Sequence, residues 1–193
     1  MTDLAFSVVG DFLRAGYEQP LWNALQAHLP WLEEYPQSGV IPLRGRESPE
    51  GFWLPRRTKL VLRIPAARVP EALPLSGTTL AWDLTALHIG VGRLRPLSAH
   101  PSLHAHLVVS NEEESGFIAT VWQAMQELGI QAQWVCGRRH VLQAYDPAIS
   151  GYSLVLHHLN PEQSLLLQSL GLGTHRSLGC GLFVPYKVIP DLE

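Results

Sequence analysis

The sequence predicts an α+β protein in which one order of strands and helices occurs twice. Three observations support this prediction. Short runs rich in β-branched and aromatic residues alternate with amphipathic helices. The order strand–helix–strand–strand–helix–strand can be followed in each half of the 193 residues. Hydrophobic residues form 46% of the chain and charged residues 16%, a balance typical of a globular protein with an ample core.

The first half opens with a β-rich run at residues 3–10. A helix is expected over residues 20–29, with Pro20 in its first turn and Pro30 as its stop. Its apolar stripe at helical spacing consists of Leu21, Trp22, Leu25 and Leu29. The remaining elements of this half are strands at residues 39–43 and 51–65, a short proline-interrupted helix at 66–74, and a strand or hairpin at 78–94. Within the second strand, apolar residues alternate with Lys59 and Arg63, which should point away from the core.

The second half repeats this order more clearly. Strands are expected at residues 102–110, 132–137, 151–159 and 178–188, with residues 138–150 connecting the second strand to the third. The first helix, at residues 113–130, stops at Gly129. Its buried face should consist of Phe117, Val121, Met125 and Leu128. The second helix begins with Asn160 as its cap, Pro161 at its first position and Glu162 in its first turn, and Gly171 ends it.

Each half therefore has the β-α-β-β-α-β order of a ferredoxin-like (RRM-like) domain. We expect an N-terminal domain at residues 1–97 and a C-terminal domain at 98–193, divided near residues 96–101. The halves share the order of their elements and no convincing residue-level repeat. A glycine-rich loop at residues 171–181 lies between the last helix and the last strand.

Composition limits the classes of function. A net charge of −3 and a pI near 6.3 argue against an indiscriminate polyanion binder, although they are compatible with a local basic face. The chain has no signal-peptide pattern and no apolar run near the roughly 20 residues that cross a bilayer. Cys136 and Cys180 are far apart and outside any CxxC, so no thiolate zinc site is expected. We expect a cytoplasmic protein without a membrane partner, a metal or another cofactor.

The stretch GLGTHRSLGCGLFVP at residues 171–185 holds four glycines. Ordered glycine loses much backbone entropy, so four of them indicate unusual dihedral angles or close backbone approach. A dinucleotide fingerprint or P-loop would precede a helix, whereas this loop follows one and lacks GK[ST]. The loop can therefore expose backbone N–H groups, with His175 and Arg176, to a sugar-phosphate chain. The alternative is a helix cap followed by a β-bulge.

Two ferredoxin-like units with this glycine loop near the C-terminus resemble the RAMP superfamily of CRISPR-associated proteins. Within it, the chain is similar to the short (MYXAN-type) branch of the CRISPR repeat-processing endoribonucleases. The similarity covers nearly the whole chain. It is carried by DLAFSVVG, LWNAL, CGRRHVLQ and, most specifically, GYSLVLHHLNPEQSLLLQSLGLG followed by RSLGCGLFVP.

The resemblance implies a metal-independent RNA cleavage. The ribose 2′-OH attacks the adjacent phosphate and leaves a 2′,3′-cyclic phosphate and a 5′-OH. This chemistry needs in-line positioning, a proton donor or acceptor, and a cation near the phosphorane. The implied partners are a CRISPR repeat hairpin and the backbone subunits of a CRISPR surveillance complex, to which the protein stays bound after cutting.

The resemblance also implies a catalytic histidine in an Asp-His-Gly-Tyr-like stretch at the first helix. In LRAGYEQPLW that position holds Ala15 when aligned on Gly16-Tyr17, or Tyr17 when aligned on LWNAL. Tyr17 is our first catalytic candidate, because a phenol can orient the 2′-OH or donate a proton. Its alternative role is a half-buried residue at the helix start. His28 is the second candidate because imidazole titrates near neutral pH, and otherwise it is a surface histidine.

The expected RNA-binding residues are Arg56, Arg57, Lys59, Arg138, Arg139, His140, Gly171, Gly173, His175, Arg176, Gly179 and Gly181. Residues 56–59 could follow the backbone through charge, or be a solvated strand edge. Residues 138–140 suit phosphates and guanine edges, or form an exposed hairpin tip. Trp53, beside a basic stretch, could stack a base.

Two other functions remain open. A protein of the same fold could hold the repeat hairpin without cutting it, which the missing histidine favours. Alternatively, His100, His104 and His106 could mark a metal- or ligand-binding β-protein, since His104 and His106 share one face of a strand. The ligand series is incomplete, and alternation alone explains both histidines.

Overall fold

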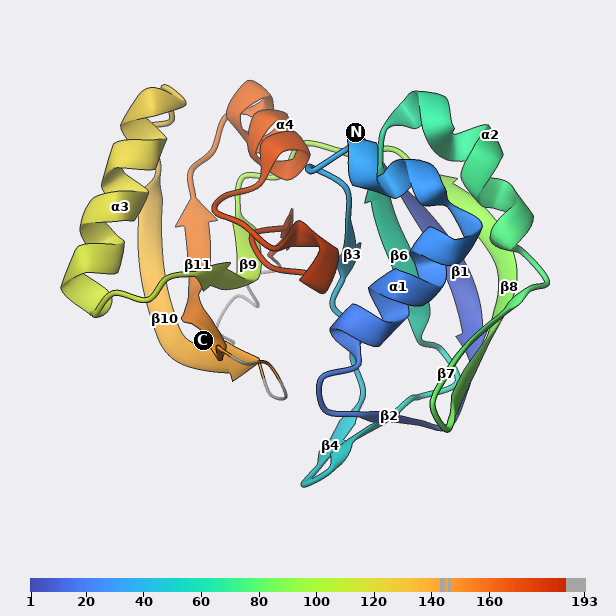
Figure 1. The fold of residues 1–193 in the computed structure, drawn as a ribbon. Helices are drawn as coiled ribbons and strands as arrows, with labels where there is room; N and C mark the ends of the chain where they lie inside the picture. Colours follow the sequence, from blue (N-terminus) through green and yellow to red (C-terminus); the bar gives the residue numbers. More distant parts are fainter. Residues whose placement is uncertain (143–144, 146, 187–193) are drawn as a thin grey trace, which may run out of the picture. The chain divides into compact units, whose positions relative to one another are not determined.

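The computed structural model describes residues 1–142, 145 and 147–186, and they form two compact units (Figure 1). Unit 1 comprises Met1–Leu97, Leu142–Ala148 and Arg176–Gly179, and unit 2 comprises Ser98–Val141, Ile149–His175 and the chain from Cys180 onward. Two short segments of the C-terminal half therefore belong to unit 1, one of them inside the glycine loop.

Unit 1 is built on a five-stranded antiparallel sheet in the order β3-β6-β1-β8-β7. Its strands are β1 (Thr2–Val9), β3 (Gly39–Ile41), β6 (Lys59–Ile64), β7 (Thr79–Trp82) and β8 (Thr85–Arg95). Its helices are α1 (Glu18–His28), η1 (Pro30–Glu34), η2 (Ala66–Arg68), α2 (Val69–Ala72), η3 (Leu73–Leu75) and, from the glycine loop, η4 (Arg176–Leu178). Without β7, the strand order is that of a ferredoxin-like domain, which confirms the predicted fold class.

The core of unit 1 follows the predicted periodicities. Alternate residues of β1 and β6 are buried against the apolar stripe of α1, as predicted from the two-residue and helical spacings. Helix α1 begins at Glu18, two residues before the predicted start, and Pro30 opens the 3-10 helix η1 that follows it. Residues 78–94 were predicted to form either a strand or a hairpin, and the structure shows the hairpin β7–β8.

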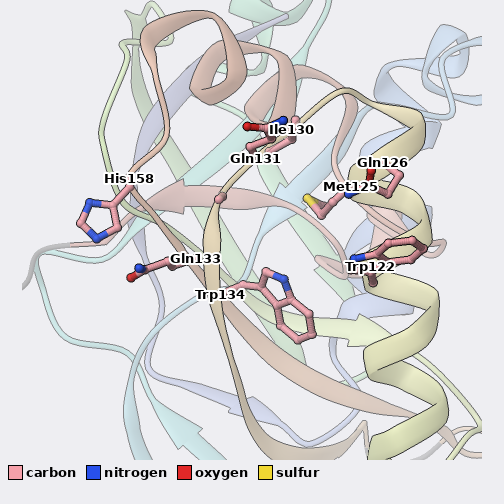
Figure 2. Close-up of a pocket in the computed structure, with 9 residues that line it drawn as sticks. Trp122, Met125, Gln126, Ile130, Gln131, Gln133, Trp134 and His158 are labelled. Atoms are coloured by element: carbon pink, nitrogen blue, oxygen red, sulfur yellow. The ribbon is translucent and has the colours of Figure 1, made fainter.

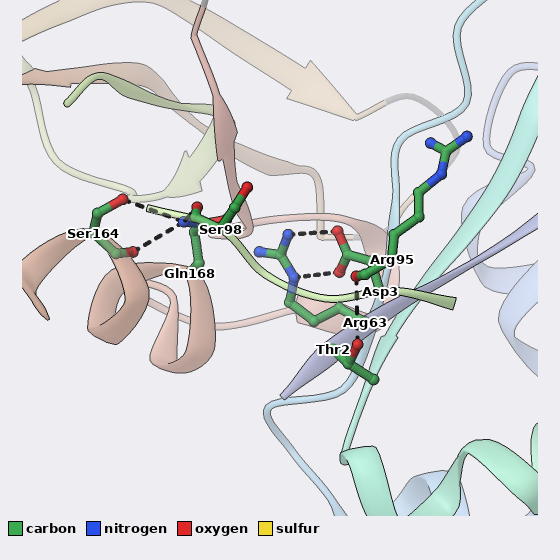
Figure 3. A network of polar contacts seen from close by, with 7 residues as sticks. All are labelled: Thr2, Asp3, Arg63, Arg95, Ser98, Ser164 and Gln168. Atoms are coloured by element: carbon green, nitrogen blue, oxygen red, sulfur yellow. Dashed lines mark hydrogen bonds and ion pairs between the residues drawn. The ribbon is translucent and has the colours of Figure 1, made fainter. Parts of the chain in front are cut away.

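Arg63 does not lie on a solvent-facing side of β6 as the alternation predicted. Its side chain is fully buried, and Nε and Nη2 donate to the two carboxylate oxygens of Asp3 at 2.8 and 3.0 Å (Figure 3). Asp3 is directly opposite Arg63 in the β1–β6 register. A bidentate pair satisfies the buried guanidinium, which is why a cation can occupy this position.

Unit 1 also contains a small second sheet that the sequence did not predict. It has the order β2-β5-β4 and consists of β2 (Phe12–Arg14), β4 (Arg46–Ser48) and β5 (Gly51–Trp53). The strand expected over residues 51–65 is thus divided into β5 and β6. Residues 54–58 form the break, closed by a turn in which Thr58 N–H donates to Pro55 O at 2.9 Å.

Unit 2 has a four-stranded antiparallel sheet in the ferredoxin-like order β10-β11-β9-β12. Its strands are β9 (Leu103–Val109), β10 (Gln133–Leu142), β11 (Ile149–His157) and β12 (Phe183–Pro185), and its helices are α3 (Glu114–Glu127) and α4 (Pro161–Leu170). Phe117, Val121 and Met125 of α3 are buried, as predicted, whereas Leu128, the fourth predicted residue, is the C-cap and is only partly buried. The last strand, predicted at residues 178–188, is only β12, because Leu178 ends a 3-10 helix and residues 179–182 belong to the glycine-loop closure; residues 187–188 lie outside the described part of the chain.

Helix α4 has the predicted cap. Asn160 Oδ1 accepts a hydrogen bond from Gln163 N–H at 2.9 Å, and Gln163 Oε1 accepts from Asn160 N–H at 3.2 Å, which completes a capping box. Further along α4, Gln168 Nε2 donates to Ser98 O at 2.8 Å and so ties the start of unit 2 to this helix (Figure 3). No helix of the described residues is long and apolar enough to span a bilayer.

Candidate functional site

The glycine-rich loop follows α4 and has the unusual backbone that its composition predicted. Gly171, Gly173, Gly179 and Gly181 all have positive φ angles, between 65° and 83°. At Gly181 a Cβ atom would also overlap the carbonyl oxygen of Leu172. The loop closes here, because Gly181 N–H donates to Leu107 O at 2.7 Å and Leu172 N–H donates to Gly181 O at 3.0 Å. Only glycine meets both demands at this position.

The middle of this loop belongs to unit 1. The 3-10 helix η4 (Arg176–Leu178) contacts both α1 and β3. A Cβ at Gly179 would come within 2.7 Å of Pro42 Cγ, so this glycine lets the loop approach the chain that leaves β3. Arg176 is partly buried, and that burial lowers the pKa of its guanidinium. The loop thereby brings a cation to the helix that carries both catalytic candidates.

Tyr17, the first of these candidates, is a buried residue at the start of α1. Only 6% of it is exposed, its hydroxyl accepts a hydrogen bond from Leu43 N–H at 3.1 Å, and its ring packs edge-on against Phe52. Burial raises the pKa of the phenol well above its ordinary value. This environment suits a structural residue, and a catalytic role for Tyr17 stays a prediction. Ala15, the other aligned position, is exposed.

Two residues that the sequence did not single out lie beside Tyr17. Tyr145, in the connection between β10 and β11, accepts a hydrogen bond from Gln19 N–H at 3.1 Å and donates to Glu18 Oε2 at 3.4 Å. Burial raises the pKa of the Glu18 carboxyl. We refer to Tyr17, Glu18 and Tyr145 as the α1 N-terminal cluster. Tyr145 is 127 residues from Glu18 in sequence, so no local pattern could reveal the pair.

A carboxyl group with a raised pKa holds its proton to a higher pH than an ordinary carboxyl group does. The cluster therefore places a carboxyl group, hydrogen-bonded to a phenol, at the start of the helix where the resemblance expects a catalytic residue. The loop glycine Gly179 approaches Pro42, and the Tyr17 hydroxyl accepts from the next residue, Leu43. The glycine loop and the cluster thus converge on one segment of unit 1.

His28, the second predicted catalytic residue, is exposed at the other end of α1. An α-helix rises 1.5 Å per residue, so the 11 residues of α1 separate Tyr17 from His28 by roughly 16 Å. The two side chains therefore cannot both act on one scissile phosphate. They are alternatives and not a pair.

The predicted basic residues of unit 1 lie at one connection. Arg56 and Arg57 are exposed in the turn between β5 and β6, and Lys59 is the exposed first residue of β6. By contrast, Arg68 from the same basic stretch is held by Glu34 and Glu71 at 3.2 and 2.9 Å.

In unit 2, residues 138–140 do not form the predicted connection between strands but lie within β10. The Arg139 guanidinium contacts Glu113 at 3.6 Å and Ser150 Oγ at 3.3 Å. Arg138 is exposed, and the His140 ring lies 5.0 Å from that of His106. Arg138 and Arg139 are thus both exposed, and Arg139 is the one that these contacts hold in place.

The histidines of unit 2 do not assemble into a larger ligand set among the described residues. No group of three or more His, Cys, Asp or Glu side chains that could hold a metal is found in the described part of the chain. The His104 ring lies 5.8 Å from that of Tyr186, and His106 packs near His140.

The pockets in the described residues include two open ones that each lie within a single unit. One, of about 450 Å³ in unit 2, is lined by α3 and the chain entering β10, including Trp122, Met125 and Trp134 (Figure 2). Among the residues that the structure describes, no lysine or arginine lines it, and none of the predicted site residues does. The other, of about 410 Å³ in unit 1, is lined by Phe12, Arg14, Ser48, Pro49, Glu50 and Trp53.

Comparisons with known proteins agree on one relationship. The Cas6 family model, described as Cas6 Crispr, matches residues 2–188. The chain is 36% identical over 185 residues to the CRISPR-associated endonuclease Cas6 of Myxococcus xanthus (strain DK1622), covering 95% of this chain and 80% of that protein.

Solved structures share the fold at low identity. The product of a Cas6-related gene from Pyrococcus furiosus has a TM-score of 0.63 at 10% identity, over 99% of each chain. Thermus thermophilus Cse3, bound to an RNA that represents a pre-cleavage complex, has a TM-score of 0.55 at 12% identity, over 95% of this chain and 97% of that chain.

Proposed function

Because the chain belongs to the Cas6 family of CRISPR-associated proteins, we propose that it binds a CRISPR repeat hairpin and cuts precursor CRISPR RNA. One observation carries the proposal: the 36% identity to an endonuclease of this family extends over nearly the whole chain. The fold shared with an RNA-bound relative supports RNA as the substrate class. The predicted activity is thus that of an RNA-processing endonuclease.

We further propose that the ribose 2′-OH is the nucleophile and that no metal takes part. The protein would then supply positioning, a proton-transfer group and a cation for the phosphorane. Arg176 is our candidate for the cation because η4 contacts α1. The N–H groups of Gly171, Gly179 and Gly181 already donate to backbone carbonyls, so phosphate oxygens would be bound by other backbone N–H groups of the loop.

The proton-transfer group is expected on α1 or next to it. His28 is the exposed candidate on the helix, and the Glu18–Tyr145 pair is the candidate at its N-terminal end. Tyr17 remains a candidate, although its hydroxyl already accepts a hydrogen bond from the backbone. Since α1 separates its two ends by roughly 16 Å, only one end can serve the reaction.

The basic residues would hold the rest of the RNA. Arg56, Arg57 and Lys59 are exposed and would contact phosphates through charge, so their contribution should weaken with salt. Arg138 and His140 would contact the hairpin from unit 2, with Arg139 oriented by its contacts to Glu113 and Ser150. After cutting, the protein would stay bound as a subunit of a surveillance complex in the cytoplasm.

A second candidate function is repeat binding without cleavage. It is favoured by one observation, that neither Ala15 nor Tyr17 supplies the expected histidine. The same hairpin would then be held by the same basic residues, and another nuclease would cut it.

The test is a cleavage assay with the repeat RNA encoded beside the gene, in excess EDTA. We expect cleavage by the wild-type protein, and a loss of roughly 10²- to 10⁴-fold for whichever of His28→Ala or Tyr145→Phe removes the proton-transfer group. His88→Ala, an exposed histidine elsewhere in unit 1, is the matched control. Tight binding without cleavage would support the second candidate function, repeat binding alone. Cleavage that neither variant reduces would show that neither His28 nor Tyr145 is the proton-transfer group.

A further inference from the structure

The small sheet of unit 1 has one face turned to the core and one face turned outward. Leu13 of β2 is fully buried and Phe52 of β5 packs on the core beside Tyr17, so these two residues mark the inner face. Residues opposite each other in antiparallel strands share a face, and so do residues two apart in a strand. Phe12, Trp53 and Arg46 therefore form one row across the outer face.

The next row of the outer face is Arg14, Gly51 and Ser48. Gly51 has a φ of +151°, and a Cβ there would overlap the Leu13 carbonyl oxygen, so the central position of this row must lack a side chain. The result is a hollow between Trp53 and the turn at Glu50, where the 410 Å³ pocket lies. Its volume is sufficient for one base with part of its sugar.

Trp53 forms a wall of this pocket and is 55% exposed. Its ring centroid lies 5.0 Å from that of Phe12 at an angle of 58°, so Phe12 supports one part of the indole while much of the indole stays open to solvent. An indole held in a fixed position with an open face is the feature on which single-stranded nucleic acids stack their bases. A paired base inside a stem has both faces covered and could not occupy it.

The charges around the pocket fit the same occupant. Arg14 and Arg46 flank the aromatic pair, both are exposed, and neither has an ion pair among the described side chains. Arg14 lines the pocket and Arg46 is opposite Trp53 in the β4–β5 register, so both guanidinium groups are placed to contact phosphates next to a base stacked on Trp53. Glu50, in the turn between β4 and β5, lines the same pocket and would repel a phosphate placed beside it, so the base edge and not the backbone should face this carboxylate.

From these observations we propose that the outer face of the β2-β5-β4 sheet, centred on Trp53, binds an unpaired nucleotide that flanks the repeat hairpin. This proposal rests on the proposed function for the identity of the RNA. The base stacks on Trp53, Arg14 and Arg46 contact its phosphates, and Glu50 accepts hydrogen bonds from an amino-bearing base, which disfavours uracil.

The test measures the affinity of the full-length protein for two RNAs, the hairpin with its single-stranded flanks and the stem–loop alone, each with a 2′-deoxy sugar at the cut site. Trp53→Ala should weaken binding of the flanked RNA by roughly 5- to 150-fold and leave the stem–loop affinity unchanged. Trp122→Ala is the matched control, because Trp122 is 59% exposed and lies in unit 2 with no arginine lining its pocket. It should change neither affinity.

Equal affinity of wild type and Trp53→Ala for the flanked RNA would overturn the proposal, and so would an equal loss for both RNAs. If Trp53→Ala does not fold, Trp53→Phe is used instead, and RNA-induced quenching of tryptophan fluorescence should be smaller in this variant than in wild type. If wild type binds no repeat RNA, the proposed function is wrong, and an unstructured adenine oligonucleotide then tests the pocket alone. Quenching that depends on Trp53 would still support base binding at this pocket. The absence of such quenching would rule it out.

Discussion

The guanidinium of Arg63 and the carboxylate of Asp3 face each other across the β1–β6 ladder and form two hydrogen bonds, at 2.8 and 3.0 Å. Arg63 is fully buried, whereas the Asp3 side chain is 18% exposed. Removing one partner of such a pair leaves a charge in the interior without its counter-charge.

Asp3→Asn should therefore lower the free energy of unfolding of unit 1 by about 3 kcal/mol. Urea denaturation followed by tryptophan fluorescence measures the change. Asp83→Asn is the control, since Asp83 is exposed and its positive φ of 45° suits asparagine. Equal midpoints for the two variants would show that the pair contributes little to stability.

Tyr17→Phe should destabilise the fold without abolishing cleavage. The variant removes the acceptor of the Leu43 N–H group in a buried site, which costs about 1–3 kcal/mol. We expect a lower melting temperature and a cleavage rate near that of wild type below the transition. Normal melting with lost cleavage would instead assign the phenol to the reaction.

Gly181→Ala should be more destabilising than Gly129→Ala. Both glycines have a φ of 65°, so alanine introduces similar left-handed strain of about 1–2 kcal/mol at each. A Cβ at Gly129 meets nothing within 4 Å, whereas one at Gly181 overlaps the Leu172 carbonyl. The difference in urea midpoints thus isolates the close approach at the base of the glycine loop. Indistinguishable midpoints would mean that the loop relaxes freely.

Glu18→Gln should increase stability at neutral pH, and the gain should vanish in acid. Burial raises the folded-state pKa of Glu18, so the folded protein holds this proton more tightly than the unfolded chain does. Stability from this group is present below the ordinary carboxyl pKa and declines as pH rises through the folded pKa. Unfolding midpoints at several pH values, with the exposed Glu33→Gln as control, measure the effect. A stability gain of Glu18→Gln that is equally large in acid would contradict the assigned pKa shift of Glu18.

Local patterns in the sequence predict those elements whose stabilising contacts are near in sequence. The buried face of α3 and the Asn160 cap of α4 depend on residues three or four apart, and both are as predicted. The four loop glycines likewise signal their own positive φ angles. The functional residues of the loop could be nominated in the same way, although their roles remain proposals.

Contacts between distant segments could not be predicted in this way. Burial of Arg63 depends on the strand register that brings Asp3 opposite it. The Glu18–Tyr145 pair depends on a connection of the second half that belongs to unit 1. Likewise, Trp53 was noted only for its basic neighbours, and its pairing with Phe12 required the unpredicted three-stranded sheet.

The most direct test of the central proposal is cleavage of the repeat hairpin in EDTA, with matched RNAs that carry a ribose or a 2′-deoxyribose at the cut site. The products are identified by mass spectrometry. We predict a 2′,3′-cyclic phosphate and a 5′-OH from the ribose substrate and no cleavage of the deoxy substrate, which should still bind. Cleavage of the deoxy substrate, or cleavage that EDTA abolishes, would contradict the proposed 2′-OH mechanism.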